Sequence, residues 1–172
     1  MRKKVKAYSL PKLVYEVLYK DGQYFSLKKE TIFNMIVQGL GFEKVIDMGS
    51  DIVDERKTLS FNLNDTNTEL FPEMLKQSGS ITESDFLRKV FLTYINLHPS
   101  LRERVLYKDL FLKIEQAIKE KKKLKIYINK KVLDIVPIAL ERNPETNYNC
   151  LKARVGEEIF LYEMKDVEKI LK

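Results

Sequence analysis

The feature that most constrains this chain is an internal repeat of one strand followed by two helices. Residues 4–41 contain a short strand, VKAYSL, and then two segments whose apolar residues have helical spacing. Residues 57–97 repeat this order, beginning with the alternating strand TLSFNL. Leu10 corresponds to Leu63, and the offset between the copies is 53 to 54 residues. One such copy has too little apolar surface to fold alone, so the two copies are predicted to pair their strands and share a core.

This strand-helix-helix order resembles the ribbon-helix-helix family, in which two copies form a two-stranded antiparallel ribbon that enters the DNA major groove. Because this chain carries both copies, the resemblance implies an intramolecular pseudo-dimer over residues 1–99, joined by a connector at 42–56. A helical bundle with two incidental strands is the alternative. The phase of the first strand stays open, because one phase buries Tyr8 whereas the opposite phase exposes Lys4, Lys6 and Tyr8.

Candidate nucleic-acid contacts lie on these two strands and in the basic segment before the first. They are Lys3, Lys4, Lys6, Ser9, Thr58, Ser60 and Asn62. Lysine pairs with phosphate, and short hydroxyl and amide side chains can bond base edges, although a solvated surface needs the same residue types. The strands VKAYSL and TLSFNL contain no arginine, which makes the commonest specific contact with guanine. We therefore expect weak sequence discrimination.

The second half begins with a helix and continues with strands. Residues 100–122 are predicted to form one linker helix, opened by a capping box of Ser100 and Glu103. Residues 123–172 alternate in four or five short strands, which is typical of a small barrel. The sequence therefore predicts an α+β protein with an N-terminal ribbon and helices, a linker helix and a C-terminal barrel.

Three segments of this half, IEQAIKEKKKLKIYI, YNCLKA and YEMKDV, resemble the WYL domain, a small Sm- or SH3-like barrel of bacterial regulators and CRISPR-associated proteins. Of the Trp-Tyr-Leu motif only Leu151 is kept, and Glu163 stands in the place of a family arginine. The resemblance implies a groove for a nucleotide-like or other anionic ligand. Its candidate residues are Lys125, Tyr127, Arg142, Lys152 and Arg154.

Composition narrows the classes of function. The net charge is +6, and a single cysteine excludes an internal disulfide. No apolar run approaches the roughly 20 residues of a membrane span, so a cytoplasmic protein that does not bind membranes is expected. His98 is the only histidine, and neither a phosphate-binding glycine loop nor a metal-ligand cluster is present. We therefore expect no enzymatic activity, no catalytic residues, no metal and no cofactor.

Three functions follow from these patterns. The leading one is a nucleic-acid-binding, WYL-type transcriptional regulator that binds DNA. The second is a single-stranded-RNA-binding accessory protein that modulates a type VI CRISPR effector, since tandem ribbon-helix-helix and WYL organisation resembles accessories of that system. The third is a protein-interaction scaffold. The partners expected are nucleic acid, an anionic ligand, a second copy of the chain or a CRISPR effector.

Overall fold

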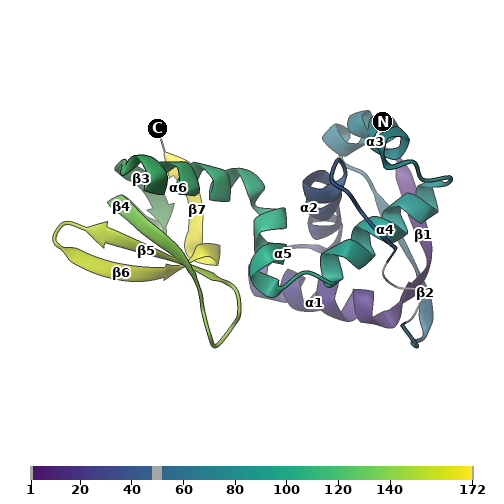
Figure 1. Ribbon diagram of the computed structural model, residues 1–172, viewed down its shortest axis with the longest axis horizontal. Helices are drawn as coiled ribbons and strands as arrows, with labels where there is room; N and C mark the ends of the chain where they lie inside the picture. Colours follow the sequence, from purple (N-terminus) through teal and green to yellow (C-terminus); the bar gives the residue numbers. More distant parts are fainter. Residues whose placement is uncertain (1, 48–51, 172) are drawn as a thin grey trace. The chain divides into compact units, whose positions relative to one another are not determined.

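The structure, a computed structural model, describes residues 2–47 and 52–171 (Figure 1). The fold is α+β, as predicted, and it divides into two compact units with the boundary between Leu97 and His98. They are called unit 1 and unit 2. Part of the connector predicted over 42–56 lies outside the described residues.

Unit 1 contains both copies of the repeat. Its elements are β1 (Lys4–Pro11), α1 (Lys12–Phe25), α2 (Lys29–Leu40), β2 (Arg56–Asn62), α3 (Asp65–Ser78) and α4 (Glu83–Ile95). The two strands pair antiparallel into a two-stranded ribbon at one side of the helices (Figure 1). Lys4 lies opposite Asn62, and Lys6 lies opposite Ser60. The predicted two-stranded ribbon is thereby confirmed.

A β-bulge in β1 fixes the phase of that strand. Ser9 has a φ of 55°, in the left-handed region, and the register with β2 shifts at this point. An extra residue in one strand reverses the alternation of side chains beyond it. Lys4, Lys6 and Tyr8 therefore face outward, with Tyr8 54% exposed, whereas Leu10 is fully buried. The phase that buries Tyr8 is wrong.

The core of unit 1 lies between the inner face of the ribbon and the helices. Phe33 of α2, Phe61 of β2 and Phe91 of α4 form an aromatic cluster with ring centroids 5.2 to 5.9 Å apart. The Tyr94 hydroxyl donates a hydrogen bond of 2.6 Å to the buried carboxylate of Asp21, joining α4 to α1. The two copies of the repeat thus share one core.

Helix α3 begins well before its proline, Pro72. The side chain of Asn64 caps the helix by accepting from the Asn67 amide at 2.8 Å, so the helix begins at Asp65. Pro72 therefore lies inside the helix and not in its first turn, where proline is best tolerated. It is exposed.

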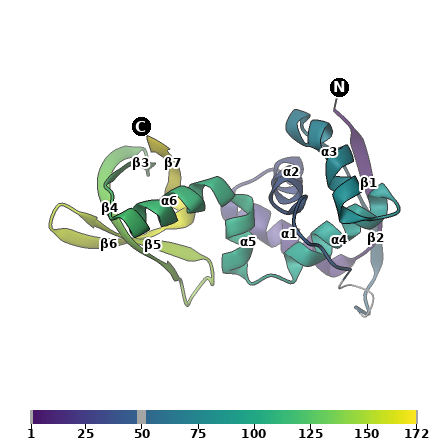
Figure 2. The same ribbon diagram turned by 45° about the horizontal axis from the view of Figure 1, so that its top comes forward.

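Unit 2 contains two helices followed by a curled sheet. Its elements are α5 (Pro99–Leu106), α6 (Lys108–Glu120), β3 (Leu124–Ile128), β4 (Lys131–Arg142), β5 (Asn149–Val155), β6 (Glu158–Glu163), the 3₁₀ turn η1 (Met164–Asp166) and β7 (Val167–Leu171). The strands form a five-stranded antiparallel sheet in the order β6-β5-β4-β3-β7 (Figure 2). The long strand β4 pairs with β3 at one end and with β5 at the other, and it has a bulge between Pro137 and Ala139.

The single linker helix predicted over 100–122 is replaced by two helices that belong to unit 2. The chain leaves helical geometry at Tyr107, which has φ −119° and ψ 42°. Phe111 and Ile114 of α6 are buried in one apolar cluster with residues of the sheet such as Leu151. The apolar face of α6 is therefore part of the core of unit 2, and α6 is no linker.

Candidate nucleic-acid interface

The outward face of the ribbon, called the ribbon face, carries most of the candidate nucleic-acid contacts. It is formed by Lys4, Lys6 and Tyr8 of β1 and by Thr58, Ser60 and Asn62 of β2. Antiparallel pairing brings these side chains side by side because the residues of each strand alternate between its two faces. In the parts of the chain that the structure describes, neither Lys4 nor Lys6 has an ion-pair partner. Their charges are therefore available to a phosphate.

Two candidates lie beside the ribbon face and have other contacts. The Lys3 ammonium is 2.9 Å from the Glu83 carboxylate, so part of its charge is already compensated. Ser9 forms the bulge, and its carbonyl accepts hydrogen bonds from the guanidinium groups of Arg88 and Arg56. The structure thus exposes four of the seven candidates together on the ribbon face and places Lys3 and Ser9 at its margin. The hydroxyl of the remaining candidate, Ser60, is buried.

The candidates for the anionic groove of unit 2 lie on separate strands. Lys125 and Tyr127 are on β3, where Lys125 is opposite Asp134 and the Lys169 ammonium lies 5.7 Å from the centre of the Tyr127 ring. Lys152 and Arg154 are on β5. Strand β4 lies between β3 and β5, so these two pairs are not direct neighbours.

Arg142, the fifth candidate, lies at the end of β4 in an acidic setting. It lines a cavity of about 410 Å³ whose other charged lining residues are Glu141, Glu145 and Glu163. Cys150 lines the same cavity, and burial together with the charge of Glu163 raises the pKa of its thiol. The four other groove candidates do not line this cavity, so the structure does not gather the five cations and aromatics in one place.

A buried polar cluster of unit 2 was missed by the sequence analysis. The carboxylate of Glu103 accepts two hydrogen bonds of 2.7 Å from Asn149, one from its backbone amide and one from its side chain. The same side-chain amide donates to the Ser100 carbonyl at 2.8 Å. The predicted capping box of Ser100 and Glu103 is wrong. The residue that caps α5 is His98, whose Nδ1 accepts a hydrogen bond from the Ser100 amide.

Burial has a large effect on the acidity of this cluster. Glu103 is 1% exposed, and its burial raises the carboxyl pKa to about 7, against a smaller lowering by the hydrogen bonds from Asn149. Asn149 occupies the tryptophan position of the motif in YNCLKA. No local spacing in the sequence links it to Glu103, so no sequence signal pointed to the cluster.

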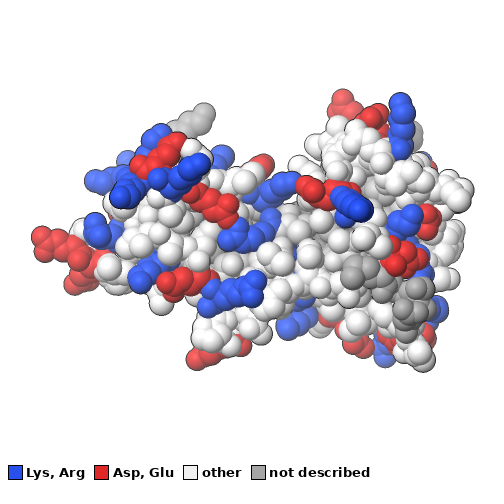
Figure 3. All heavy atoms as spheres, in the orientation of Figure 1, with Lys and Arg blue, Asp and Glu red and all other residues white. Residues whose placement is uncertain are grey.

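Charges of both signs cover the face of the molecule shown in Figure 3. In unit 2, Lys and Arg side chains gather over α6 and the turn that follows it. The exposed residues there include Lys119, Lys121, Lys122 and Lys123, of which Lys122 pairs with Glu120 at 2.8 Å. Within residues 2–47 and 52–171, no acidic, histidine and cysteine side chains are grouped so that they could hold a metal ion. No helix in these ranges has the length and apolarity to cross a membrane.

The similarity of this chain to known proteins lies in its fold. No family model matches the chain, and no curated protein matches it. The fold is similar to that of a solved protein described as a CRISPR Cas-related protein, with a TM-score of 0.73 at 16% sequence identity. The similarity covers 99% of this chain and 63% of that protein, so this chain spans less than two thirds of its length. What the two proteins share is the fold, across both units of this chain.

Proposed function

We propose that this protein is a nucleic-acid-binding accessory protein of a CRISPR system. The observation that carries the proposal is the ribbon face, where Lys4 and Lys6 lie beside the exposed side chains of Thr58 and Asn62. Such a surface offers cations to phosphates and short polar groups to bases or sugars. The similarity in fold to a CRISPR Cas-related protein supports the assignment to such a system.

The side chains of the ribbon favour binding without strong sequence preference. Lysine contacts phosphates as a point charge, whereas the rigid fork of the arginine guanidinium is better suited to bidentate reading of guanine. Arg56, at the end of β2, donates instead to the carbonyls of Ser9 and Ile52. This arrangement suits an accessory protein that contacts a nucleic-acid backbone better than it suits a transcriptional regulator that recognises one operator.

The proposal includes a family assignment for each unit. The paired strand-helix-helix copies of unit 1 support a ribbon-helix-helix assignment. The five-stranded curled sheet of unit 2, packed on α6, supports an Sm- or SH3-like barrel of the WYL type. Unit 2 then docks a type VI effector or binds an anionic ligand through Lys125, Tyr127, Lys152 or Arg154, and neither unit performs a catalytic step.

A binding panel tests the proposal. Labelled single-stranded RNA, single-stranded DNA and duplex DNA of one sequence are titrated at salt concentrations between about 50 and 200 mM. We expect K4A/K6A to weaken binding to every sequence and to reduce the slope of log K against log salt by roughly 1.4 for single strands, about 0.7 for each lost phosphate contact. K113A/K119A on α6 removes the same charge elsewhere and is the control.

The panel also separates the alternative functions. Binding to duplex DNA alone, with a clear preference for one sequence, would favour the DNA-binding regulator. No binding even at low salt would favour the protein-interaction scaffold. The CRISPR assignment is tested by adding the protein to a purified type VI effector with its guide RNA, where we expect the rate of RNA cleavage to change.

A further inference from the structure

The two repeat copies differ in one region where the fold does not require a difference. First helices correspond at an offset of 53 and second helices at 54, as their first residues show: Lys12 and Asp65, then Lys29 and Glu83. At these offsets the first copy has Lys12, Tyr15, Tyr19 and Lys29 where the second has Asp65, Thr68, Pro72 and Glu83. The second copy forms the same helices without these tyrosines and lysines. Helix formation therefore does not explain why the first copy has tyrosines and lysines at these positions.

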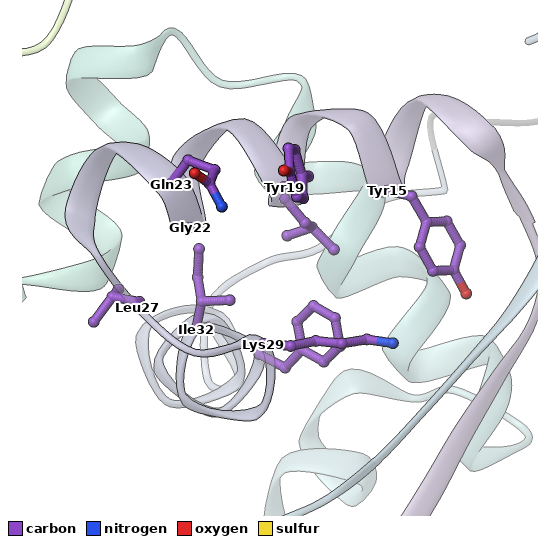
Figure 4. Close-up of a pocket in the computed structure, with 9 residues that line it drawn as sticks. Tyr15, Tyr19, Gly22, Gln23, Leu27, Lys29 and Ile32 are labelled. Carbon is purple, nitrogen blue, oxygen red and sulfur yellow. The ribbon is translucent and has the colours of Figure 1, made fainter.

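These residues line a groove, called the α1–α2 groove, that runs between α1 and α2 and along β2. It consists of three adjoining cavities of about 440, 430 and 400 Å³. Tyr15 and Tyr19 line the first two cavities, and Lys29 and Phe33 line the first and third. Figure 4 shows Tyr15 and Tyr19 on α1, with Lys29 of α2 extending along the groove toward the side of Tyr15.

The groove combines aromatic rings with cations. Its cationic lining residues are Lys4, Lys12, Lys29 and Lys57, and its acidic ones are Glu16 and Glu30. The Lys57 ammonium lies 5.9 Å from the centre of the Tyr15 ring, and the Lys29 ammonium lies 5.8 Å from that of Phe33. Tyr19 is 71% exposed, so its ring is open to a ligand. Aromatic rings beside lysines are the components of sites that stack bases and hold the phosphates between them.

The edge of β2 that does not pair with β1 contributes one backbone N–H and one backbone C=O to the groove. The Leu63 amide donates to the Lys3 carbonyl, so in this register Ser60 belongs to a non-hydrogen-bonded pair and its backbone N–H and C=O point away from β1. On one side of Ser60 along this edge, the Thr58 carbonyl accepts from the Tyr15 hydroxyl. On the other side, the Asn62 amide donates to Glu30 at 2.6 Å. Ser60 lies between these two contacts and lines the groove.

The corresponding region of the second copy is acidic and already paired. Asp65 lies 3.3 Å from the guanidinium of Arg2, and Glu83 lies 2.9 Å from the ammonium of Lys3. The charges at these two positions are thus reversed between the copies. The first copy therefore presents cations where the second presents compensated ion pairs, so an anionic ligand is favoured by the first copy.

We infer that the α1–α2 groove binds single-stranded nucleic acid. An unpaired base stacks on Tyr15 and Tyr19 with its edge toward the backbone of Ser60, and the flanking phosphates contact Lys12, Lys29 and Lys57. A base within a duplex is stacked on both faces and cannot enter the cavity, so the site selects single strands. The inference rests on the proposed function and deepens it by naming the class of strand.

A tryptophan reporter tests stacking directly, because the chain contains no tryptophan. Y19W places the single reporter in the groove, and P72W places it at the equivalent position of the second copy. Titration with oligo(U) or oligo(dT) is expected to quench Y19W fluorescence and leave P72W fluorescence unchanged, whereas a duplex of equal length quenches neither. Equal quenching at both positions, or none at position 19 while the oligonucleotide is bound, overturns the inference.

Affinity measurements separate the groove from the ribbon face. K12A/Y19A changes two exposed groove residues and is expected to weaken oligo(U) and oligo(dT) binding by roughly tenfold or more, as loss of a stacked base does. K6A alters the ribbon face only. If K6A weakens binding and K12A/Y19A does not, the groove is overturned and the proposed function stands. If the wild-type protein binds no oligonucleotide at low salt, both are overturned. The ratio of RNA to DNA affinity then tells which strand the groove prefers.

Discussion

Glu103 illustrates how the role of one residue depends on a partner that local sequence does not reveal. Its position after Ser100 predicts a helix cap, yet its carboxylate accepts from the backbone and side chain of Asn149, which is 46 residues away. A carboxylate with two charge-assisted hydrogen bonds stays ionised more easily. Burial outweighs these bonds and raises the pKa to about 7. The protein therefore holds a titrating acid inside unit 2.

We predict that this acid makes the stability of unit 2 depend on pH. The folded-state pKa of about 7 lies above the ordinary value of 4.5, so the stabilising contribution is complete below pH 4.5 and is lost as pH rises to 7. The difference corresponds to about 3 kcal/mol in the free energy of unfolding. E103Q keeps an oxygen that accepts from the Asn149 amide and cannot ionise. Urea unfolding between pH 5 and pH 8 is expected to show this decline in the wild type and a smaller one in the variant.

His98 also contributes to the pH dependence of stability, in the wild type and in E103Q alike. Burial, together with the charges of Arg142 and Arg102, lowers the pKa of His98. A lowered histidine pKa removes stability as pH falls, which is the opposite slope. Both proteins share this contribution, so the difference between them reports Glu103 alone. Parallel profiles for the wild type and E103Q would show that Glu103 does not titrate in this range.

At the scale of elements, the periodicity of apolar residues predicts which strands and helices form. It does not predict the bulges and breaks within them. The alternation of TLSFNL places Leu59 and Phe61 inward and Thr58 and Ser60 outward, as the structure confirms. The phase of β1 could not be predicted, because the bulge at Ser9 depends on contacts with α4. The break at Tyr107 was also missed, since the apolar spacing continues across it. The α1–α2 groove needs three elements placed together, and single-strand patterns do not show that arrangement.

The two repeat copies hold the ribbon by the same device, which gives a prediction for α4. Asn34 of α2 donates to the Asn62 carbonyl at 3.0 Å, and Arg88, its equivalent in α4, donates to the Ser9 carbonyl. The Arg88 side chain is only 16% exposed and also pairs with Asp47. We expect R88A to lower the free energy of unfolding by about 1–3 kcal/mol, because a charge-assisted bond and the bulge it holds are lost.

K89A is the matched control for that variant. Lys89 is the next residue of α4 and pairs with Asp85 within the same helix at 3.1 Å. Such a pair contributes about 0.5 kcal/mol or less. Urea denaturation of the two variants is the measurement. Equal losses of stability for R88A and K89A would show that the contact with Ser9 does not hold the bulge.

At the scale of the whole molecule, the division into two units predicts that each folds by itself. The aromatic cluster of Phe33, Phe61 and Phe91 lies within unit 1, whereas the apolar cluster from Phe111 to Val167 is built from residues of unit 2. Residues 1–97 and residues 98–172, prepared separately, are each expected to unfold cooperatively in urea. Domains of this size fold alone when their core is their own.

Measurements on the separate units also show which unit carries the fluorescence quenching and which carries the pH-dependent stability. Residues 1–97 carrying Y19W are expected to keep the oligonucleotide-dependent quenching, because the groove and the ribbon face lie in unit 1. Residues 98–172 are expected to keep the decline in stability between pH 5 and pH 7, because Glu103 and Asn149 both lie in unit 2. A fragment that lacks a cooperative transition would show that its core depends on the other unit. Quenching that requires the full chain would place part of the nucleic-acid site in residues 98–172.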